Sequence, residues 1–64
     1  MEMKRISEFF ENYNFTNEER EIIKDYNGEE SYLLYHAFIN TDLEDSDENL
    51  YLVFRANFIE DIDE

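Results

Sequence analysis

Apolar residues near the N-terminus recur at the spacing of one helix face. Four lie at i, i+3, i+7 and i+10, and a fifth stands beside them: Met3, Ile6, Phe10, Tyr13 and Phe9. Because this spacing brings side chains to one side of a helix with 3.6 residues per turn, it predicts a short amphipathic helix over residues 3–13.

A second helix is indicated by a start signal, an apolar stripe and a stop signal. Residues 16–19 have the form of a capping box, in which the Thr16 hydroxyl and the Glu19 carboxylate each accept from the other residue's amide. The apolar stripe that follows consists of Ile22, Ile23 and Tyr26. An Asn-Gly pair at 27–28 then suits a helix end.

From residue 31 the chain becomes rich in aromatic and β-branched residues, which favour strands. Residues 32–39 and 50–59 are the two candidate strands. In the second, alternate residues would share one apolar side: Leu50, Leu52, Phe54, Ala56 and Phe58. The pattern predicts one small α+β domain over residues 1–64, with two short N-terminal helices packed on an antiparallel β-hairpin.

A two-stranded sheet is only marginally stable by itself. Its outer face would still expose apolar side chains such as Tyr51 and Val53. We therefore expect a homodimer that completes a larger sheet. The alternatives are that the two helices cover both faces, or that residues 59–64 add a strand.

The composition indicates a folded chain in spite of its charge. It is 42% hydrophobic and 17% aromatic, with no Pro and one Gly, whereas disordered acidic segments have few aromatic residues. The absence of Cys excludes disulfides and Cys-ligated metal modules. Since no apolar run approaches the length of a membrane span and the N-terminus lacks a signal-peptide core, we expect a cytoplasmic protein.

The residue spacing favours neither a metal site nor an enzyme. A twelve-residue calcium loop that opened at Asp42 would place Asp47 and Val53 where an EF-hand needs Gly and Glu, and the register from Asp45 fails in the same way. The single His, His36, lies among aromatic residues. With no Cys nucleophile and no Gly-rich phosphate loop, the chain is expected to have no catalytic residues and no cofactor.

The charge carries the functional information. The chain has 18 acidic and 5 basic residues, for a formal net charge of -13 at pH 7. Residues 1–28 hold seven acids and four bases, whereas residues 29–64 hold eleven acids and one base, Arg55. Such a chain is not expected to bind nucleic acid or anionic lipid directly, because both require Lys and Arg. It predicts a strongly basic partner, and basic surfaces commonly bind nucleic acid.

Paired carboxylates have a spacing that suits imitation of a DNA backbone. Duplex DNA presents a phosphate about every 1.7 Å of its axis. Carboxylates at i and i+3 on a helix lie about 5–6 Å apart, and those at i and i+2 on a strand about 6.7 Å apart. Three pairs have one of these separations: Glu18 with Glu21, Asp45 with Asp47, and Asp61 with Asp63.

These observations predict a DNA mimic that inhibits a host DNA-binding protein by occupying its basic DNA site. The predicted contact residues are eight acids and two tyrosines: Glu18, Glu19, Glu21, Asp42, Glu44, Asp45, Asp47, Glu48, Tyr35 and Tyr51. The tyrosines, together with Leu43, are expected to fill an apolar pocket of the partner, where binding energy concentrates.

Four segments resemble the phage uracil-DNA glycosylase inhibitor family: residues 6–10, 18–23, 33–38 and 45–52. The resemblance implies that the first two segments are helices and the last two a hairpin. It also implies that Glu18, Glu19 and Glu21 imitate DNA phosphates, and that an apolar pocket receives a Leu of the glycosylase. The family's strand between its two helices has no counterpart in residues 13–15.

Other targets and two other classes of function fit the same sequence. Phage proteins of this size and charge also inhibit CRISPR effectors, restriction enzymes and nucleoid proteins. An immunity or antitoxin protein that neutralises a basic nuclease is the principal alternative. An acidic accessory subunit that imitates nothing is the third.

Overall fold

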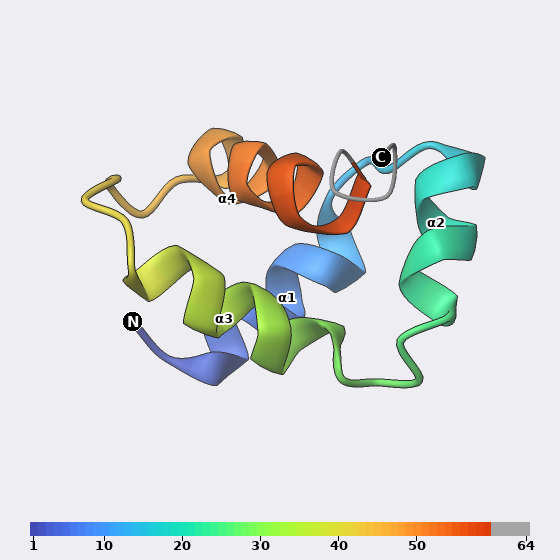
Figure 1. Ribbon diagram of the computed structural model, residues 1–64, viewed down its shortest axis with the longest axis horizontal. Coiled ribbons are helices and arrows are strands. Elements are labelled where there is room, and N and C mark those ends of the chain that lie inside the picture. The colour runs from blue at the N-terminus through green and yellow to red at the C-terminus, as the bar shows by residue number, and fades with distance from the viewer. Residues whose placement is uncertain (60–64) are drawn as a thin grey trace.

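A computed structural model describes residues 1–59, and all the regular secondary structure in this part of the chain is helical (Figure 1). The elements are four α-helices and a closing π-helical turn: α1 (Met3–Asn12), α2 (Asn17–Lys24), α3 (Glu30–Ile39), α4 (Asp47–Phe54) and η1 (Arg55–Ile59). In Figure 1, α3 lies in front of α1, against which it packs. α4 contacts α3 and continues into η1, and α2 stands at the far end beside η1.

The two N-terminal helices form where the sequence predicts them. α1 ends one residue earlier than predicted, and its buried face consists of Ile6, Phe9 and Phe10. α2 begins with the predicted capping box: Thr16 Oγ1 accepts from the Glu19 amide at 3.1 Å, and Glu19 Oε1 accepts from the Thr16 amide at 2.9 Å. These reciprocal bonds satisfy amides that a helix start leaves without partners.

The predicted β-hairpin is wrong, and with it the α+β fold class. Both candidate strands are helical, and no strand occurs anywhere in residues 1–59. The hairpin implied by the resemblance to glycosylase inhibitors is therefore not formed either. The expected homodimer loses its structural reason, since this part of the chain has no sheet face to cover. The strand in residues 59–64, considered as an alternative to the homodimer, falls almost wholly outside the described residues.

α4 shows why the strand reading of residues 50–59 failed. The buried residues are Leu50, Val53, Phe54 and Phe58, which lie at i, i+3, i+4 and i+8. This is the spacing of a helix face, whereas Leu52, which a strand would bury, is 60% exposed. Ser46 caps the helix, since its hydroxyl accepts from the Asn49 amide at 3.1 Å.

The periodicity of α3 does not identify it as a helix, because its own apolar residues occur on nearly all of its sides. Its buried residues, Leu34 and Phe38, lie one helical turn apart. A short apolar run of this kind fits a buried strand or a helix equally well by periodicity. The turn before it passes through Asn27 and Gly28 with positive φ values of 56° and 90°. The Gly28 amide donates to Glu30 Oε1 at 3.0 Å, at the start of α3.

The core is predominantly aromatic and contains every phenylalanine of the chain. These are Phe9, Phe10, Phe15, Phe38, Phe54 and Phe58. Phe15, from the α1–α2 connection, meets Phe9 edge to face with ring centroids 5.4 Å apart, and its ring lies 5.0 Å from that of Phe54. Such pairs contribute about 0.5–1.5 kcal/mol each beyond the burial of their area. The core therefore joins α1, α3, α4 and η1 into one unit.

Candidate partner-binding surface

Glu19 is a buried carboxylate that joins three parts of the fold. Only 4% of the residue is exposed. Its Oε2 accepts from the Tyr51 hydroxyl at 2.5 Å and from Nη1 of Arg55 at 3.1 Å, while Oε1 accepts from the Thr16 amide. Burial alone would raise the pKa of Glu19, but these hydrogen bonds outweigh it and hold the pKa below its ordinary value. Glu19 is therefore ionised at neutral pH and ties α2 to α4 and η1.

Two of the predicted contact residues thus serve the interior. Glu19 is not accessible to a partner, and Tyr51 is half-buried with its hydroxyl committed to Glu19. The same hydrogen bond is the main reason that the pKa of Tyr51 is raised. We therefore leave both residues out of the contact surface.

Arg5 fastens the α3–α4 connection to α1. Its Nε donates to Asp45 Oδ1 at 3.0 Å and its Nη2 donates to Asp47 Oδ1 at 2.8 Å. The hydrogen bond to Asp47 is the main reason that the pKa of Arg5 is raised. The two carboxylate side chains remain 49% and 57% exposed. Asp45 and Asp47 are therefore accessible, but each already has a cationic partner.

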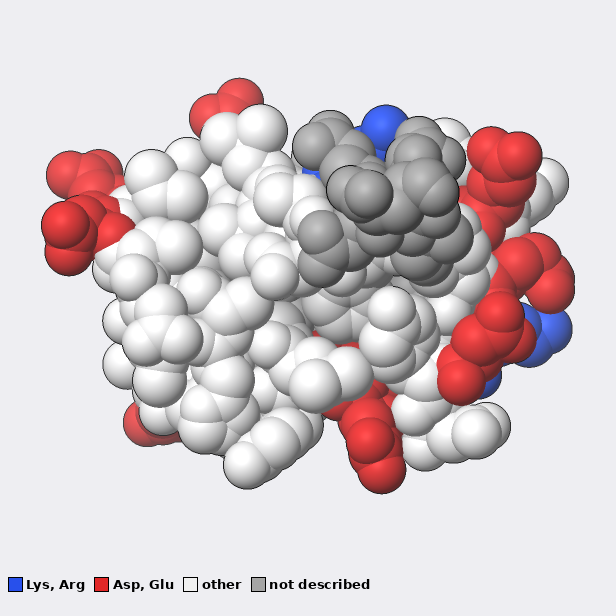
Figure 2. All heavy atoms as spheres, in the orientation of Figure 1, with Lys and Arg blue, Asp and Glu red and all other residues white. Residues whose placement is uncertain are grey.

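The other predicted acids are exposed: Glu18 and Glu21 on α2, Asp42 and Glu44 in the α3–α4 connection, and Glu48 in the first turn of α4. Within residues 1–59 only Glu21 of this set has a cationic partner, since Lys24 Nζ lies 3.7 Å from its Oε2. Figure 2 shows acidic atoms over α2 at one end and at the α3–α4 connection at the other, with further acidic atoms along the lower edge. The fold therefore separates the predicted contact residues into two groups.

An uncharged face lies between these two groups. α3 and α4 form the front of the molecule in Figure 1, and Figure 2 shows this side to be largely free of charged atoms. Several large apolar residues of these two helices are exposed: Tyr32, Leu33, Ile39 and Leu52. Leu43, in the connection, is also exposed, at 44%, and Tyr35 is half-buried. A partner that met this face would contact apolar side chains in the middle and carboxylates at the rim.

Several residues that shape this surface escaped the sequence-based prediction. Arg5 and Arg55 hold acidic groups in place, yet no local pattern pairs them with residues so distant in the chain. Ser46 could have been found, because a Ser followed by two acids and an apolar run is a helix start. That signal would also have favoured a helix over a strand in the residues that follow Ser46.

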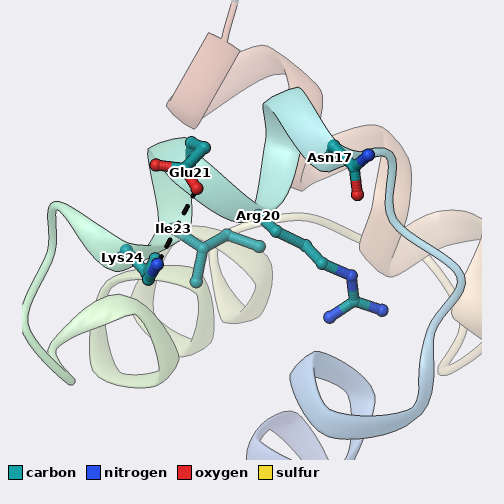
Figure 3. Close-up of a pocket in the computed structure, with 5 residues that line it drawn as sticks. All are labelled: Asn17, Arg20, Glu21, Ile23 and Lys24. Atoms are coloured by element: carbon teal, nitrogen blue, oxygen red, sulfur yellow. Dashed lines mark ion pairs between the residues drawn. The ribbon is translucent and has the colours of Figure 1, made fainter.

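A hollow of about 430 Å³ lies along α2 (Figure 3). All its lining residues come from that helix: Asn17, Arg20, Glu21, Ile23 and Lys24. In Figure 3 Arg20 and Lys24 point in different directions, and Lys24 is paired with Glu21. Arg20 donates to the Tyr13 carbonyl at 3.1 Å and lies over the Phe15 ring. The polar groups therefore do not converge on a point where a ligand would sit.

No group of three or more His, Cys, Asp or Glu residues is placed to hold a metal ion within residues 1–59. The helices in this same range are too short or too polar for any of them to cross a membrane. Comparison of the chain with protein-family models, curated proteins and solved structures found no match. Function is therefore inferred from the chain's own residues.

Proposed function

We propose that this protein is a DNA mimic that binds the basic DNA-binding site of another protein and excludes DNA from it. The proposal is supported by exposed carboxylates that have no cationic partner in residues 1–59. They are Glu2, Glu8, Glu11, Glu18, Asp25, Glu29, Asp42, Glu44 and Glu48. A surface that needed charge only for solubility would carry both signs interspersed.

The dimensions of the protein suit a DNA-binding groove. The two largest extents of the protein are 26 and 25 Å. One DNA strand places its phosphates about 3.4 Å apart, so a face of this size covers about seven of them. The acids at the two ends of the α3–α4 face would meet the basic rims of such a groove, while the apolar middle would contact its floor.

The energetics favour a basic partner over a solvated surface. Self-repulsion among the carboxylates destabilises the folded chain. A basic groove that neutralises them relieves this repulsion, and the counterions of both surfaces are released. Binding is therefore expected to weaken steeply as salt is added, as DNA binding does.

The proposed targets are proteins that hold DNA in a basic groove. Uracil-DNA glycosylase, CRISPR effectors, restriction enzymes and nucleoid proteins belong to this class, and inhibition of any of them would suit a phage protein in the bacterial cytoplasm. The sequence resemblance favours the glycosylase, but the two segments that it implies to be a hairpin lie mainly in helices α3 and α4. DNA mimicry is therefore proposed from the charge and its placement.

Affinity purification from a bacterial lysate, with elution by DNA, tests the proposal. The expected result is a DNA-binding protein that DNA releases from the column and that loses DNA affinity when this chain is added. A partner that binds DNA with unchanged affinity in the complex would refute DNA mimicry and favour an accessory subunit. A secreted or plasmid-encoded nuclease as the sole partner would replace it with the immunity-type function.

Charge-neutral variants test whether the position of the acids matters. The triple change Asp42→Asn, Glu44→Gln and Glu48→Gln removes three exposed charges at the α3–α4 connection. The matched control, Glu2→Gln, Glu8→Gln and Glu11→Gln, removes three exposed charges from the N-terminal residues and α1, the helix behind α3 in Figure 1. The first variant should bind the partner more weakly than the control at equal salt. Equal affinities would mean that only total charge is recognised.

A further inference from the structure

α3 presents a row of exposed aromatic and apolar side chains. They are Tyr32, 58% exposed, Leu33, 40% exposed, Ile39, 47% exposed, and His36, which is also exposed. The stretch from Ser31 to Thr41 contains no Asp, Glu, Lys or Arg. An exposed helix normally turns charged residues outward. The outward side of α3 is therefore built for contact with something other than water.

The aromatic rings in this row are held in place before any partner binds. The Tyr32 and His36 rings meet edge to face, with centroids 4.3 Å apart and an interplanar angle of 64°. The Tyr35 ring also meets the His36 ring edge to face, with centroids 5.4 Å apart and an interplanar angle of 86°. Because the Tyr32 ring is ordered by His36 and yet more than half exposed, little conformational entropy is lost when a partner covers it.

Acidic residues stand at both ends of the row. Glu30 and Glu29 lie two and three residues before Tyr32, and Asp42 and Glu44 follow the helix. A helix of this length extends over about 15 Å, so one segment of a partner can reach the rings and both acidic ends. Such a segment must carry positive charge and also bind aromatic surface.

Arginine meets both requirements and lysine meets only one. The planar guanidinium stacks on aromatic rings and pairs with carboxylates through two parallel hydrogen bonds, whereas the lysine ammonium is a strongly hydrated point charge. A second copy of this chain is a poor occupant of this face, because it would bring a second net charge of -13 against the first.

We infer that the outward face of α3 binds an arginine-bearing segment, with a guanidinium stacked on Tyr32 and further arginines paired with the acids at the ends of the helix. The inference rests on the proposed function for its basic partner. It deepens that function by naming arginine, rather than positive charge in general, as the group recognised on this face.

Two peptides of equal length and charge, octa-arginine and octa-lysine, test this directly. Their affinities for the full chain are measured by titration calorimetry at about 50 and 150 mM salt, where charge pairing is partly screened. The ratio of the two affinities should fall about two- to fivefold in Tyr32→Leu, since this is what one exposed cation–π contact contributes. Tyr32→Phe, which keeps the ring, should retain the wild-type ratio.

Met3→Ala is the control because Met3 is also an exposed apolar residue but belongs to another helix, α1. Its arginine-to-lysine ratio should equal that of the wild type, and circular dichroism should show that all variants are folded. A Tyr32→Leu variant that is folded and keeps the wild-type ratio overturns the inference. That outcome does not bear on whether this chain excludes DNA from its purified partner. An arginine preference together with a partner that still binds DNA in the complex would refute the proposed function alone.

Discussion

Replacing Glu19 by Gln should destabilise the protein far more than any other single neutralisation of an acid on α2. Gln keeps the size and retains an oxygen for the Thr16 amide. Its amide nitrogen, however, would face Arg55, which has donors only. Tyr51 would lose a charge-assisted hydrogen bond of 2.5 Å. Hydrogen bonds to charged groups contribute about 1.5–3 kcal/mol each, but Arg55 is 40% exposed and can turn to water, so we expect a loss of about 2–3 kcal/mol that comes chiefly from the Tyr51 bond.

A loss of this size should be easy to measure in so small a protein. A chain of this length is expected to have an unfolding free energy of about 3–10 kcal/mol. For small domains each kcal/mol lowers Tm by about 4–8 °C, so the expected decrease is roughly 8–24 °C. Glu18→Gln is the control, because it removes one negative charge from the preceding residue of the same helix, which is exposed. Its effect should stay within about 0.5 kcal/mol.

The pH dependence provides an independent signature of the same network. Because the pKa of Glu19 is depressed below its ordinary value of 4.5, the network contributes stability above that pH. The contribution is lost as the pH falls through the folded-state pKa. The difference in Tm between the wild type and Glu19→Gln should therefore be largest near neutral pH and shrink below pH 4.5.

Two results would refute this account of Glu19. One is a decrease in Tm for Glu19→Gln that is no larger than the decrease for Glu18→Gln. The other is a wild-type to variant difference that stays constant from neutral pH to well below the ordinary carboxyl pKa. Either would mean that the buried carboxylate does not hold α2 against α4 and η1.

Three further predictions concern the fold and its charge. Added salt should raise Tm between about 10 and 200 mM, because screening relieves self-repulsion, and a flat thermal denaturation series would contradict this. Arg5→Gln should cost about 1 kcal/mol or less in urea unfolding, since its two ion pairs are half-exposed. Val53→Ala should cost about 1.5–3 kcal/mol and Leu52→Ala almost nothing, whereas the opposite order would favour the strand register.

The N-terminal half could be predicted because its signals are local. The capping residues Thr16 and Glu19 lie three apart in the chain, and α1 has a clear apolar face opposed by polar residues. The C-terminal half lacks such contrast. Around α3 and α4 apolar residues occur on the exposed side as well as the buried one, so their periodicity does not distinguish a helix from a strand. The β-branched and aromatic content then favoured strands. Packing of these residues in a helical core overrides that preference.

The candidate surface was predicted in its charge and missed in its arrangement. Composition alone indicates a basic partner, since it depends on the count of acids. Which acids are free depends on contacts between distant residues, such as Arg5 with Asp47 and Arg55 with Glu19. The exposed rings of α3 follow only from the helical register, because in a strand Tyr32 and His36 would not be neighbours one turn apart.

The few basic residues explain how so acidic a chain keeps a defined fold. Arg5 holds the acidic α3–α4 connection to α1, and Arg55 in η1 pairs with the buried carboxylate of Glu19. Arg20 packs on Phe15 of the core. These cations lie where acidic segments join the core, whereas most exposed carboxylates have no cationic partner in residues 1–59. Neutralising an exposed acid without a partner should therefore change binding with little effect on folding, whereas replacing Glu19 should affect folding first.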